Sequence, residues 1–573
     1  AWAVACGKPE AVRALLEQGA PQIAAPDGRS LGEIAGEKQN VEIVELLEGH
    51  RRIEATHQGR VRWFVKNACP DHDIRGPAAH AIARNTAQRM LRAHPEIARD
   101  SFYTAIVCGS IAEVERLLAG RPGLANEKGG AKGWEPLLYL CFTRLPSVHD
   151  ASNNAIAMAR LLLDRGADPN AYFMAGDSRY TPLVGVIGEG EEDRPPHPQR
   201  DALVRLLLDR GAEPYDSQVL YNIHFHGNVL WFLKLIYDES VRRDRSTDWR
   251  DPEWHMLDMG GYGTGARYLL EIAVRKNDVA LAVWLLAHGA NPESPAPSDP
   301  RFPKRSLYEA ARRVGHDAVA DALARYGATK IDVQLQGEDA FVRASVARDF
   351  EGARRLAAEH PEYLRSPGSI ISAAERDRPD VVAFLLDMGV PIEIENERKQ
   401  RPLHAAAWKN ALYVAELLIA RGADIDPRES QWGNTPLDFA VYGQLPDMIT
   451  LLSRYSRDIW NLVFTGNVER VRKVLNENPE LARVVSRKNE TPLMWLPDDE
   501  AAAVRLVELL LAHGADPAIR DNNGRTAADH ASRRGLDEAG ALLQARDSSS
   551  LFSLRSTTIS WHGNDRDGTP TQR

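Results

Sequence analysis

The stretch Arg401-Pro-Leu-His-Ala-Ala-Ala407, followed by Gly422-Ala-Asp-Ile-Asp426, decides the fold of this chain. Variants of it recur along the sequence. From Arg401 to Thr435 is 34 residues, and from Thr491 to Thr526 is 35. A period of this length predicts a solenoid of stacked helix pairs, because a short unit can bury its apolar side only against its neighbours.

Two recurrent signals mark the helices of each unit. A Thr-Pro-Leu triplet, or a variant of it, opens the first helix, because Thr caps a helix and Pro fits its first turn. A Gly-Ala pair closes the second helix, because glycine adopts the left-handed conformation that ends helices. Leucines at helical spacing precede the exits and predict the buried side. The openers are Thr181, Arg401, Thr435, Thr491 and Thr526, and the clearest exits are Gly166, Gly211, Gly289, Gly422 and Gly514.

These residues resemble the ankyrin repeat over roughly residues 1–548, most closely at 401–440 and 491–535. Residues 101–141 and 258–303 also resemble a group of large bacterial ankyrin-repeat proteins. The resemblance implies an all-α ankyrin-repeat solenoid with short hairpin loops, for which the period predicts about fourteen helix pairs. It also implies that His404 bonds to the loop of its repeat.

We expect an N-terminal arc at 1–330, a C-terminal arc at 331–548 and a disordered tail at 549–573, which is rich in Ser, Thr, Asp and Gly. The first arc is expected to be irregular at 53–100 and 218–266. The seam between the arcs is placed at 331–338, where Ile331–Gln336 alternates like a strand.

A polar, Pro-rich insertion at Glu189–Pro198 predicts a surface loop. A shorter insertion at 145–150 has the same character. Insertions on one side of a repeat array often lie on its binding side. We therefore expect both to contribute to partner binding.

The composition narrows the class of protein. The chain has 573 residues, 43% of them hydrophobic, with 71 basic and 80 acidic residues and a formal net charge of −9. This mild acidity argues against nucleic acid as the main partner. The sequence contains no run of 18 apolar residues, so it predicts no membrane span. Its four cysteines include no Cys-x-x-Cys pair, which fits a reducing compartment. We expect a cytoplasmic protein. The sequence starts at Ala1, and residues 1–7 resemble the end of a first helix within a repeat, so we also expect upstream residues. The sequence leaves open whether those residues include a targeting segment.

The resemblance also gives a candidate binding surface. In ankyrin repeats the residues before the turn that ends the first helix face the concave groove, and the hairpin tips line its edge. An exposed Trp or Tyr there anchors a protein partner well. The alternative is that Trp408 packs on the neighbouring repeat. The candidate set is Glu375, Arg376, Trp408, Lys409, Trp432, Tyr442, Asp498 and Asp499.

The rival hypothesis is a small-molecule binder or enzyme with its site in the irregular segment 218–266. Its basis is the local density of histidine and aromatic residues, for which buried packing is the simpler explanation. The candidate pocket residues are His224, His226, Trp249, Trp254 and Tyr262. A third possibility is a structural subunit of a larger assembly, which a broad exposed apolar patch would indicate.

No catalytic residue, metal site or cofactor is predicted. Near Cys69 only His72 lies at a spacing that suits zinc. The glycine-rich stretch Gly260–Gly265 lacks the Lys-Ser or Lys-Thr of a nucleotide loop. We therefore expect an interaction scaffold or adaptor rather than an enzyme, with an unidentified protein as its partner and an oligomeric state that the sequence leaves open.

Overall fold

A computed structural model covers the whole chain and describes residues 57–70, 72, 74–145, 154–188, 190, 192–223, 229–246, 265–296 and 304–545, together with residues 4, 6, 8, 12, 31, 34, 35 and 43. The chain divides into two compact units. The larger is Thr56–Ser456, and the smaller comprises Arg457–Arg573 and Ala1–Ala55. The arc boundary at 330 stays a prediction, and the tail at 549–573 lies outside the described residues.

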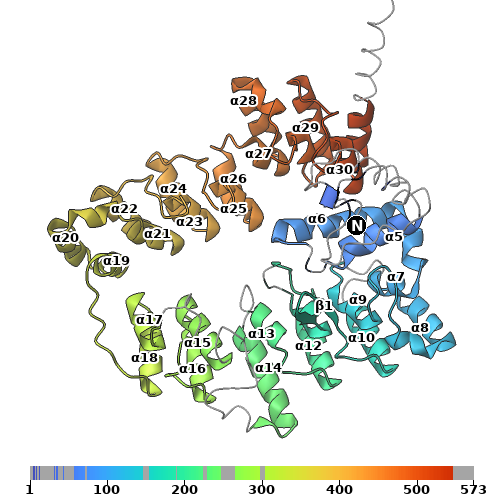
Figure 1. Cartoon of the computed structure of the whole chain (residues 1–573), viewed down its shortest axis with the longest axis horizontal. Coiled ribbons are helices and arrows are strands. Elements are labelled where there is room, and N and C mark those ends of the chain that lie inside the picture. Colours follow the sequence, from blue (N-terminus) through green and yellow to red (C-terminus); the bar gives the residue numbers. More distant parts are fainter. Residues whose placement is uncertain are drawn as a thin grey trace, which may run out of the picture. The chain divides into compact units, whose positions relative to one another are not determined.

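The larger unit consists of short helices that follow one another in pairs (Figure 1). Its helices are α5 (His57–Ala68), α6 (Pro77–Ala93), α7 (Phe102–Val107), α8 (Ile111–Gly120), α9 (Pro136–Phe142), α10 (Asn154–Asp164), α11 (Pro182–Ile187), α12 (Arg200–Asp209), α13 (Ser217–Ile223), α14 (Val229–Arg242), α15 (Gly265–Lys276), α16 (Val279–Ala287), α17 (Leu307–Arg313), α18 (Asp317–Arg325), α19 (Glu338–Val346), α20 (Phe350–Glu359), α21 (Gly368–Glu375), α22 (Pro379–Asp387), α23 (Pro402–Trp408), α24 (Leu412–Ala420), α25 (Pro436–Tyr442) and α26 (Pro446–Ser453).

The smaller unit has the same kind of elements. They are α27 (Ile459–Phe464), α28 (Val468–Glu477), α29 (Glu500–Ala512), α30 (Ala527–Arg533) and a further helical stretch at 537–545. Short 3-10 helices complete both units: η2 (Pro95–Arg99), η3 (Pro122–Asn126), η7 (Pro361–Arg365), η8 (Pro479–Arg483) and η9 (Pro492–Met494). The all-α repeat class is confirmed.

The repeat built from α23 and α24 shows how the sequence specifies each hairpin. Both helices end with a left-handed residue, Asn410 with φ 56° and Gly422 with φ 86°. At the second end, Gly422 N–H donates to Ile419 and Ala423 N–H donates to Leu418, each at 3.0 Å. These bonds satisfy carbonyls that the helix itself leaves unpaired. The predicted left-handed exit glycines are confirmed, with φ values between 85° and 101° at Gly166, Gly211, Gly289, Gly422 and Gly514.

Some second helices end by a different signal, which the sequence argument did not use. The residue after α6, α8, α20 and α28 precedes a proline, and a 3-10 helix begins at that proline. Proline sterically excludes the helical conformation from the residue before it. Accordingly these four residues have φ between −134° and −150°; they are His94, Arg121, His360 and Asn478.

Small side chains let neighbouring repeats approach. Helix α23 packs between α21 and α25, and its residues Ala405, Ala406 and Ala407 are buried. His404 Nε2 donates to the carbonyl of Asn434, 3.2 Å away in the loop before α25, which confirms the expected bond to the repeat loop. Because the carbonyl can only accept, the Nε2 atom carries the proton in this bond.

The only named strands among the described residues form a small hairpin in one inter-repeat loop. β1 (Phe173–Ala175) pairs with β2 (Ser178–Tyr180) in an antiparallel register that matches Phe173 with Tyr180. At the predicted seam, residues 331–336 form neither strand nor helix, although their apolar residues alternate as in a strand. Val333 and Leu335, two residues apart, line one pocket together with residues of α19 and α20. Within the described part of the chain, every helix is too short or too polar to span a bilayer.

Enlarging a buried alanine tests the close approach of first helices. We expect Ala406→Leu to lower the free energy of unfolding by about 1–3 kcal/mol, because Ala406 is fully buried between two neighbouring helices and extra methylenes force a shift. The measurement is urea unfolding followed by circular dichroism, with hydrogen exchange of α23 as a local readout. The matched control is Ala420→Leu, at the exposed end of α24. Equal losses in the two variants would contradict the packing argument.

Candidate functional site

Three successive first helices end on the predicted groove residues. The last residues of α21, α23 and α25 are Glu375, Trp408 and Tyr442, and all three side chains are exposed. Two positions later each chain passes through a left-handed residue, with φ of 49°, 56° and 50° respectively. The shared register places these side chains at equivalent positions in neighbouring repeats.

Trp408 is held by aromatic contacts with the next repeat while much of its surface stays open. Its ring meets Phe439 edge-on at 5.3 Å and stacks with Tyr442 at 6.1 Å. Even so, 47% of Trp408 is exposed. Packing on the neighbouring repeat and availability to a partner therefore coexist at this residue. Such contacts favour one orientation of the ring, which suits an anchor.

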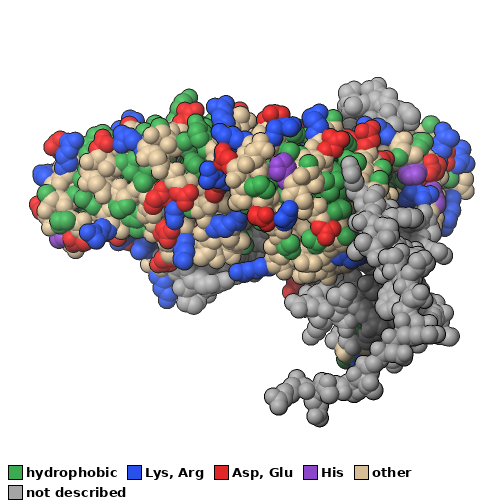
Figure 2. Space-filling model, turned by 90° about the horizontal axis from the view of Figure 1, so that it is seen from above, with side chains coloured by type: hydrophobic (Ala, Val, Ile, Leu, Met, Phe, Trp, Pro, Cys, Tyr) green, Lys and Arg blue, Asp and Glu red, His purple; other side chains and the backbone are tan. Residues whose placement is uncertain are grey.

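Charged residues flank this aromatic pair. The guanidinium of Arg376 donates to the carbonyl of Ser372 at 2.9 Å, so it caps its own helix. Lys409 is exposed, and none of the described carboxylates lies within ion-pair distance of it. On the face drawn in Figure 2, basic and acidic side chains are closely intermixed.

Trp432 lies at the predicted hairpin tip. The Glu429 carboxylate accepts the backbone N–H groups of Gln431, Trp432 and Asn434 at 2.6, 2.7 and 3.0 Å. Burial alone would raise the pKa of Glu429, but these backbone donors outweigh it and hold the pKa below its ordinary value. The loop is thus fixed around an internal carboxylate, while 62% of Trp432 is exposed.

Asp498 and Asp499 belong to the smaller unit and have structural partners there. Asp499 accepts the backbone N–H of Ala502 at 2.7 Å and caps α29. Asp498 accepts a guanidinium N–H of Arg534 at 2.7 Å. Both carboxylates are engaged within the unit, and their role in partner binding stays a prediction.

Tyr442 makes a contact that the sequence did not predict. Its hydroxyl donates to the carboxylate of Asp193 at 2.5 Å, although the two residues are 249 positions apart. A Cβ atom on Gly76 would lie only 2.6 Å from Cε2 of the Tyr442 ring, and the backbone of Gly76 is left-handed, with φ 88°. Only glycine suits that position, because it lacks the clashing atom and tolerates this backbone. Burial and Asp193 raise the pKa of Tyr442 above its usual range.

Asp193 belongs to the insertion at 189–198, and the expectation that this insertion is a surface loop is wrong. Glu192, Arg194 and His197 are all buried. The carboxylate of Glu192 accepts the Tyr180 hydroxyl at 2.9 Å. The guanidinium of Arg194 lies over the Phe142 ring at 4.8 Å and the Tyr180 ring at 5.6 Å. Polar loops are buried when the protein supplies partners for their polar groups, and composition alone does not reveal those partners.

A buried arginine ties this insertion to two helices. Arg144 donates to the carbonyls of Cys141 and Thr143 at the end of α9, at 3.1 and 3.0 Å. It also donates to Gly185 in α11 at 2.6 Å and to Pro195 in the insertion at 2.7 Å. Burial lowers the pKa of Arg144 to about 9. One guanidinium thus satisfies helix-end carbonyls and cross-links three segments.

Two buried histidines complete the network. Burial lowers the pKa of His80 to about 4, with the positive charges of Arg194 and Arg144 adding to the effect. Its Nε2 lies 3.0 Å from the carbonyl of Glu192, which partly opposes the shift. Burial likewise lowers the pKa of His197 to about 3, and its Nδ1 accepts the backbone N–H of Gln199 at 3.0 Å. Both rings are therefore neutral in the folded protein.

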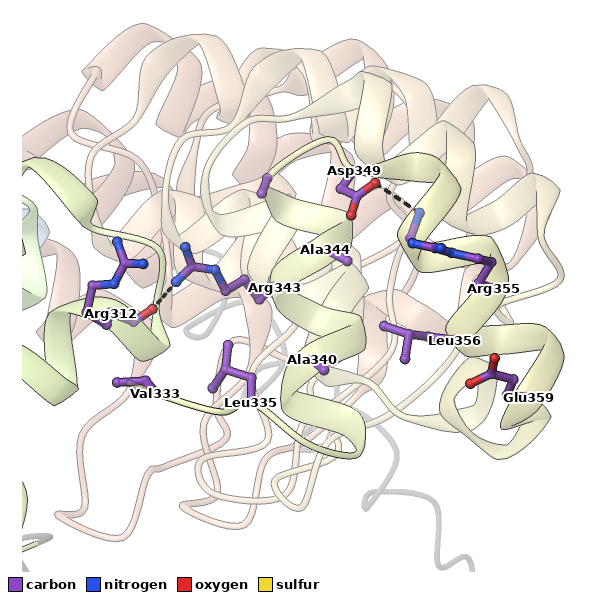
Figure 3. Close-up of a pocket in the computed structure, with 12 residues that line it drawn as sticks. Arg312, Val333, Leu335, Ala340, Arg343, Ala344, Asp349, Arg355, Leu356 and Glu359 are labelled. Carbon is purple, nitrogen blue, oxygen red and sulfur yellow. Dashed lines mark hydrogen bonds between the residues drawn. The ribbon is translucent and has the colours of Figure 1, made fainter. Parts of the chain in front are cut away.

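A pocket of about 540 Å³ lies at the predicted seam (Figure 3). Its apolar lining is Val333, Leu335, Ala340, Ala344 and Leu356, and its charged lining is Arg312, Arg343, Arg355, Asp349 and Glu359. Arg312 and Arg343 share one carboxylate, Asp317, at 2.5 and 3.2 Å. Asp349 is occupied in capping α20 through the Gly352 N–H at 2.9 Å. The pocket thus combines an apolar floor with guanidinium groups at its edge.

Comparison with known families gives a direct match in the region of the groove residues. Residues 370–462 match the family model of ankyrin repeats (three copies). The chain contains ankyrin repeats. The matched region contains Glu375, Trp408 and Tyr442, the three equivalent positions in neighbouring repeats.

Curated relatives carry the same repeat in different proteins. The ankyrin repeat protein YahD of Escherichia coli strain K12 is 26% identical over 31% of this chain and 96% of that protein. The NF-kappa-B inhibitor cactus of Drosophila yakuba is 30% identical over 24% of this chain and 26% of that protein. The human transient receptor potential cation channel subfamily A member 1 is 26% identical over 50% of this chain and 26% of that protein. The chain spans about a quarter of the length of the last two.

The alternative pocket, predicted in segment 218–266, lies outside the residues that the structure describes. His224, His226, Trp249, Trp254 and Tyr262 all lie outside the described residues. Of the neighbouring aromatic residues, Tyr268 is buried and stacks with Tyr221 at 6.2 Å, which is packing between ankyrin helices.

Near the N-terminal end of the larger unit, the Cys69 thiol donates to the carbonyl of Tyr139. No group of three or more His, Cys, Asp or Glu suited to a metal occurs among the described residues.

The buried histidines predict acid lability of the larger ankyrin unit. In the unfolded chain a histidine has a pKa near 6.5. Below that pH, His80 and His197 therefore bind protons in the unfolded state but stay neutral in the folded state. Stability is therefore complete above about pH 6.5 and is lost as the pH falls toward 4. For His80 alone the loss reaches about 3 kcal/mol at pH 4.

The measurement is urea unfolding between about pH 7 and about pH 4. We expect the double variant His80→Gln/His197→Asn to flatten this pH dependence, because its amides stay neutral. His94→Gln, at a half-exposed histidine, is the control and is expected to follow the wild type. An unchanged slope in the double variant would show that other groups govern acid unfolding.

Proposed function

We propose that this chain is a scaffold or adaptor that binds a protein partner through the groove lined by the ends of its first helices. Ankyrin repeats generally mediate protein–protein interaction, which supports the class of function. The proposal assigns Trp408 as the central anchor, with Glu375, Arg376, Lys409 and Tyr442 around it. Trp432 would contribute at the edge of the groove.

The exposed, oriented ring of Trp408 is the observation that carries this proposal. A large aromatic side chain with 47% of its surface open to solvent exposes apolar area that folding alone does not require. Its contacts with Phe439 and Tyr442 limit the freedom that the ring would lose on binding. Trp and Tyr with these properties dominate the energetics of protein interfaces.

The proposal includes a reducing compartment such as the cytoplasm. The four cysteines, Cys6, Cys69, Cys108 and Cys141, are free thiols, and all but Cys6 are buried. Burial raises the pKa of Cys108 to about 12, so its thiol is an inert core group rather than a nucleophile. These properties support an interaction protein that needs no disulfide, and the proposal includes no catalytic step.

Site-specific photo-cross-linking in the native source tests the groove. A photoreactive residue in place of Lys409 should capture one discrete protein partner, whereas one in place of Glu416 should not. The two positions are both exposed and lie in the same repeat, on α23 and α24 respectively. Equal capture at both positions, or none at Lys409, would argue against groove binding.

Truncation of the anchor supplies the energetic test. We expect Trp408→Ala to reduce capture at Lys409 at least tenfold, because an interface anchor contributes about 2 kcal/mol or more. The matched control is Tyr413→Ala, which removes an aromatic residue that is 69% exposed on the other helix of the repeat. Circular dichroism of both variants separates loss of binding from loss of fold. Undiminished capture by folded Trp408→Ala would remove this residue from the site.

A further inference from the structure

Extending the register of the groove toward the N-terminus brings cations together. The left-handed residues that follow α15, α17 and α19 are Asn277, Gly315 and Arg348, with φ of 54°, 77° and 65°. For α15, α17, α19, α21, α23 and α25 we take this residue and the two before it as equivalent positions. We call this set of positions the basic row. It contains six cations and two carboxylates, whereas the whole chain has a net charge of −9; the cations are Arg275, Lys276, Arg313, Arg348, Arg376 and Lys409, and the carboxylates are Glu375 and Asp377.

Some of these cations are already neutralised. Arg313 pairs with Glu309 at 2.8 Å and with Asp339 at 3.2 Å. Arg348 pairs with Asp380 at 2.6 Å. Partial neutralisation of this kind is usual on a protein surface and carries little energy.

Three cations of the basic row have no such partner. Arg275, Arg376 and Lys409 are exposed, and none of the described carboxylates lies within 4.0 Å of their charged nitrogens. Within the described part of the chain, Arg376 hydrogen-bonds to the carbonyl and hydroxyl of Ser372 in its own helix. These guanidinium and ammonium groups keep their capacity to bind carboxylates.

The basic row continues across the seam. His316 follows the turn of α17, and its Nδ1 lies 2.6 Å from the carbonyl of Val274 in α15. Its pKa is lowered, first by burial and also by the positive charge of Arg376, so Arg376 lies near this turn. The seam pocket shares Ala347 with the row, and its lining residue Arg312 precedes Arg313 (Figure 3). The pocket is therefore a hollow beside the row.

We propose that the partner segment is an acidic peptide that places carboxylates on Arg275, Arg376 and Lys409 and inserts one apolar side chain into the seam pocket. This inference rests on the proposed function, because it names the chemistry of the partner for the same groove. The apolar floor formed by Val333, Leu335 and Leu356 takes the side chain, and the aromatic pair Trp408 and Tyr442 lies at one end of the row.

The spacing of the row suits a peptide. Packed helices lie about 8–10 Å apart, and an extended peptide advances about 3.3 Å per residue. First helices pack in this way on each side of the seam, α15 against α17, and then α19, α21, α23 and α25 in order. A carboxylate at every third residue therefore keeps step with the first helices within each of these two stretches. A nucleic acid backbone would bring continuous negative charge onto Glu375 and Asp377, which interrupt the row and repel it. The apolar floor of the pocket likewise offers a phosphate no hydrogen-bond donor.

The probe is a synthetic peptide with glutamate at every third position, neutral residues between and one central leucine. We expect full-length protein to bind it, as measured by fluorescence anisotropy, and binding to weaken strongly when salt rises from about 0.05 M to about 0.5 M. Replacing the glutamates by glutamine should abolish binding, and replacing the leucine by glycine should weaken it several-fold. Equal binding of the glutamine peptide would overturn the proposal.

Charge reversal locates the site. Arg275→Glu/Arg376→Glu/Lys409→Glu should weaken binding of the acidic peptide more than tenfold. The matched control, Arg325→Glu/Lys330→Glu/Arg365→Glu, makes the same change in net charge at three exposed cations outside the row and should bind within about twofold of the wild type. Equal losses in the two variants would mean non-specific attraction and would refute the site. Circular dichroism confirms that both variants fold.

Two further outcomes separate this inference from the proposed function. Tighter binding of a single-stranded oligonucleotide than of the peptide, lost in the row variant, would overturn an acidic peptide in favour of nucleic acid. A photoreactive residue in place of Tyr442 can also be used to capture the native partner. If the triple charge reversal of the basic row leaves this capture unchanged, the partner segment is not acidic, and groove binding stands. Absence of both cross-linking and peptide binding would refute both.

Discussion

The structure depends on one constraint: a hairpin of two short helices cannot cover its own apolar side. In the repeat formed by α23 and α24, Ala405, Ala406 and Ala407 are buried, and α23 packs directly between α21 and α25. Stacking satisfies this constraint on two sides and leaves the ends of the first helices in solvent. Those ends carry Glu375, Trp408 and Tyr442 at equivalent positions. The surface available for recognition is thus a direct consequence of how the core is buried.

The features of the fold that follow from local chemistry could be predicted from the sequence. Gly422 and the other exit glycines take left-handed conformations because few other residues do so without strain. The groove register around Trp408 followed from the same signal. A second local signal was available and unused, since a proline after His94 or His360 excludes the helical conformation and ends the helix. The segment 331–336 misled because alternation of apolar residues also suits a link packed on one side.

The long-range polar network could not be predicted. The composition of the insertion at 189–198 is that of a surface loop, yet Arg194 and His197 are buried. What reverses the expectation is a set of partners far away in the sequence, such as Arg144, which bonds to four carbonyls in three segments. The same holds for the bond between Tyr442 and Asp193. No periodicity encodes such pairs, because each depends on the three-dimensional meeting of separate repeats.

This contact changes how the groove is understood. Tyr442 is at once a predicted groove residue, a stacking partner of Trp408 and a hydrogen-bond donor to Asp193 of the insertion. A partner that binds on Trp408 would therefore meet a Tyr442 side chain whose position is already set by its bond to Asp193 and its contact with Gly76. An aromatic side chain that is already ordered before binding loses less conformational entropy when a partner binds. The insertion, expected to touch the partner itself, contacts Tyr442 beside the proposed anchor in this structure, so within the proposed function it would orient the groove rather than bind the partner.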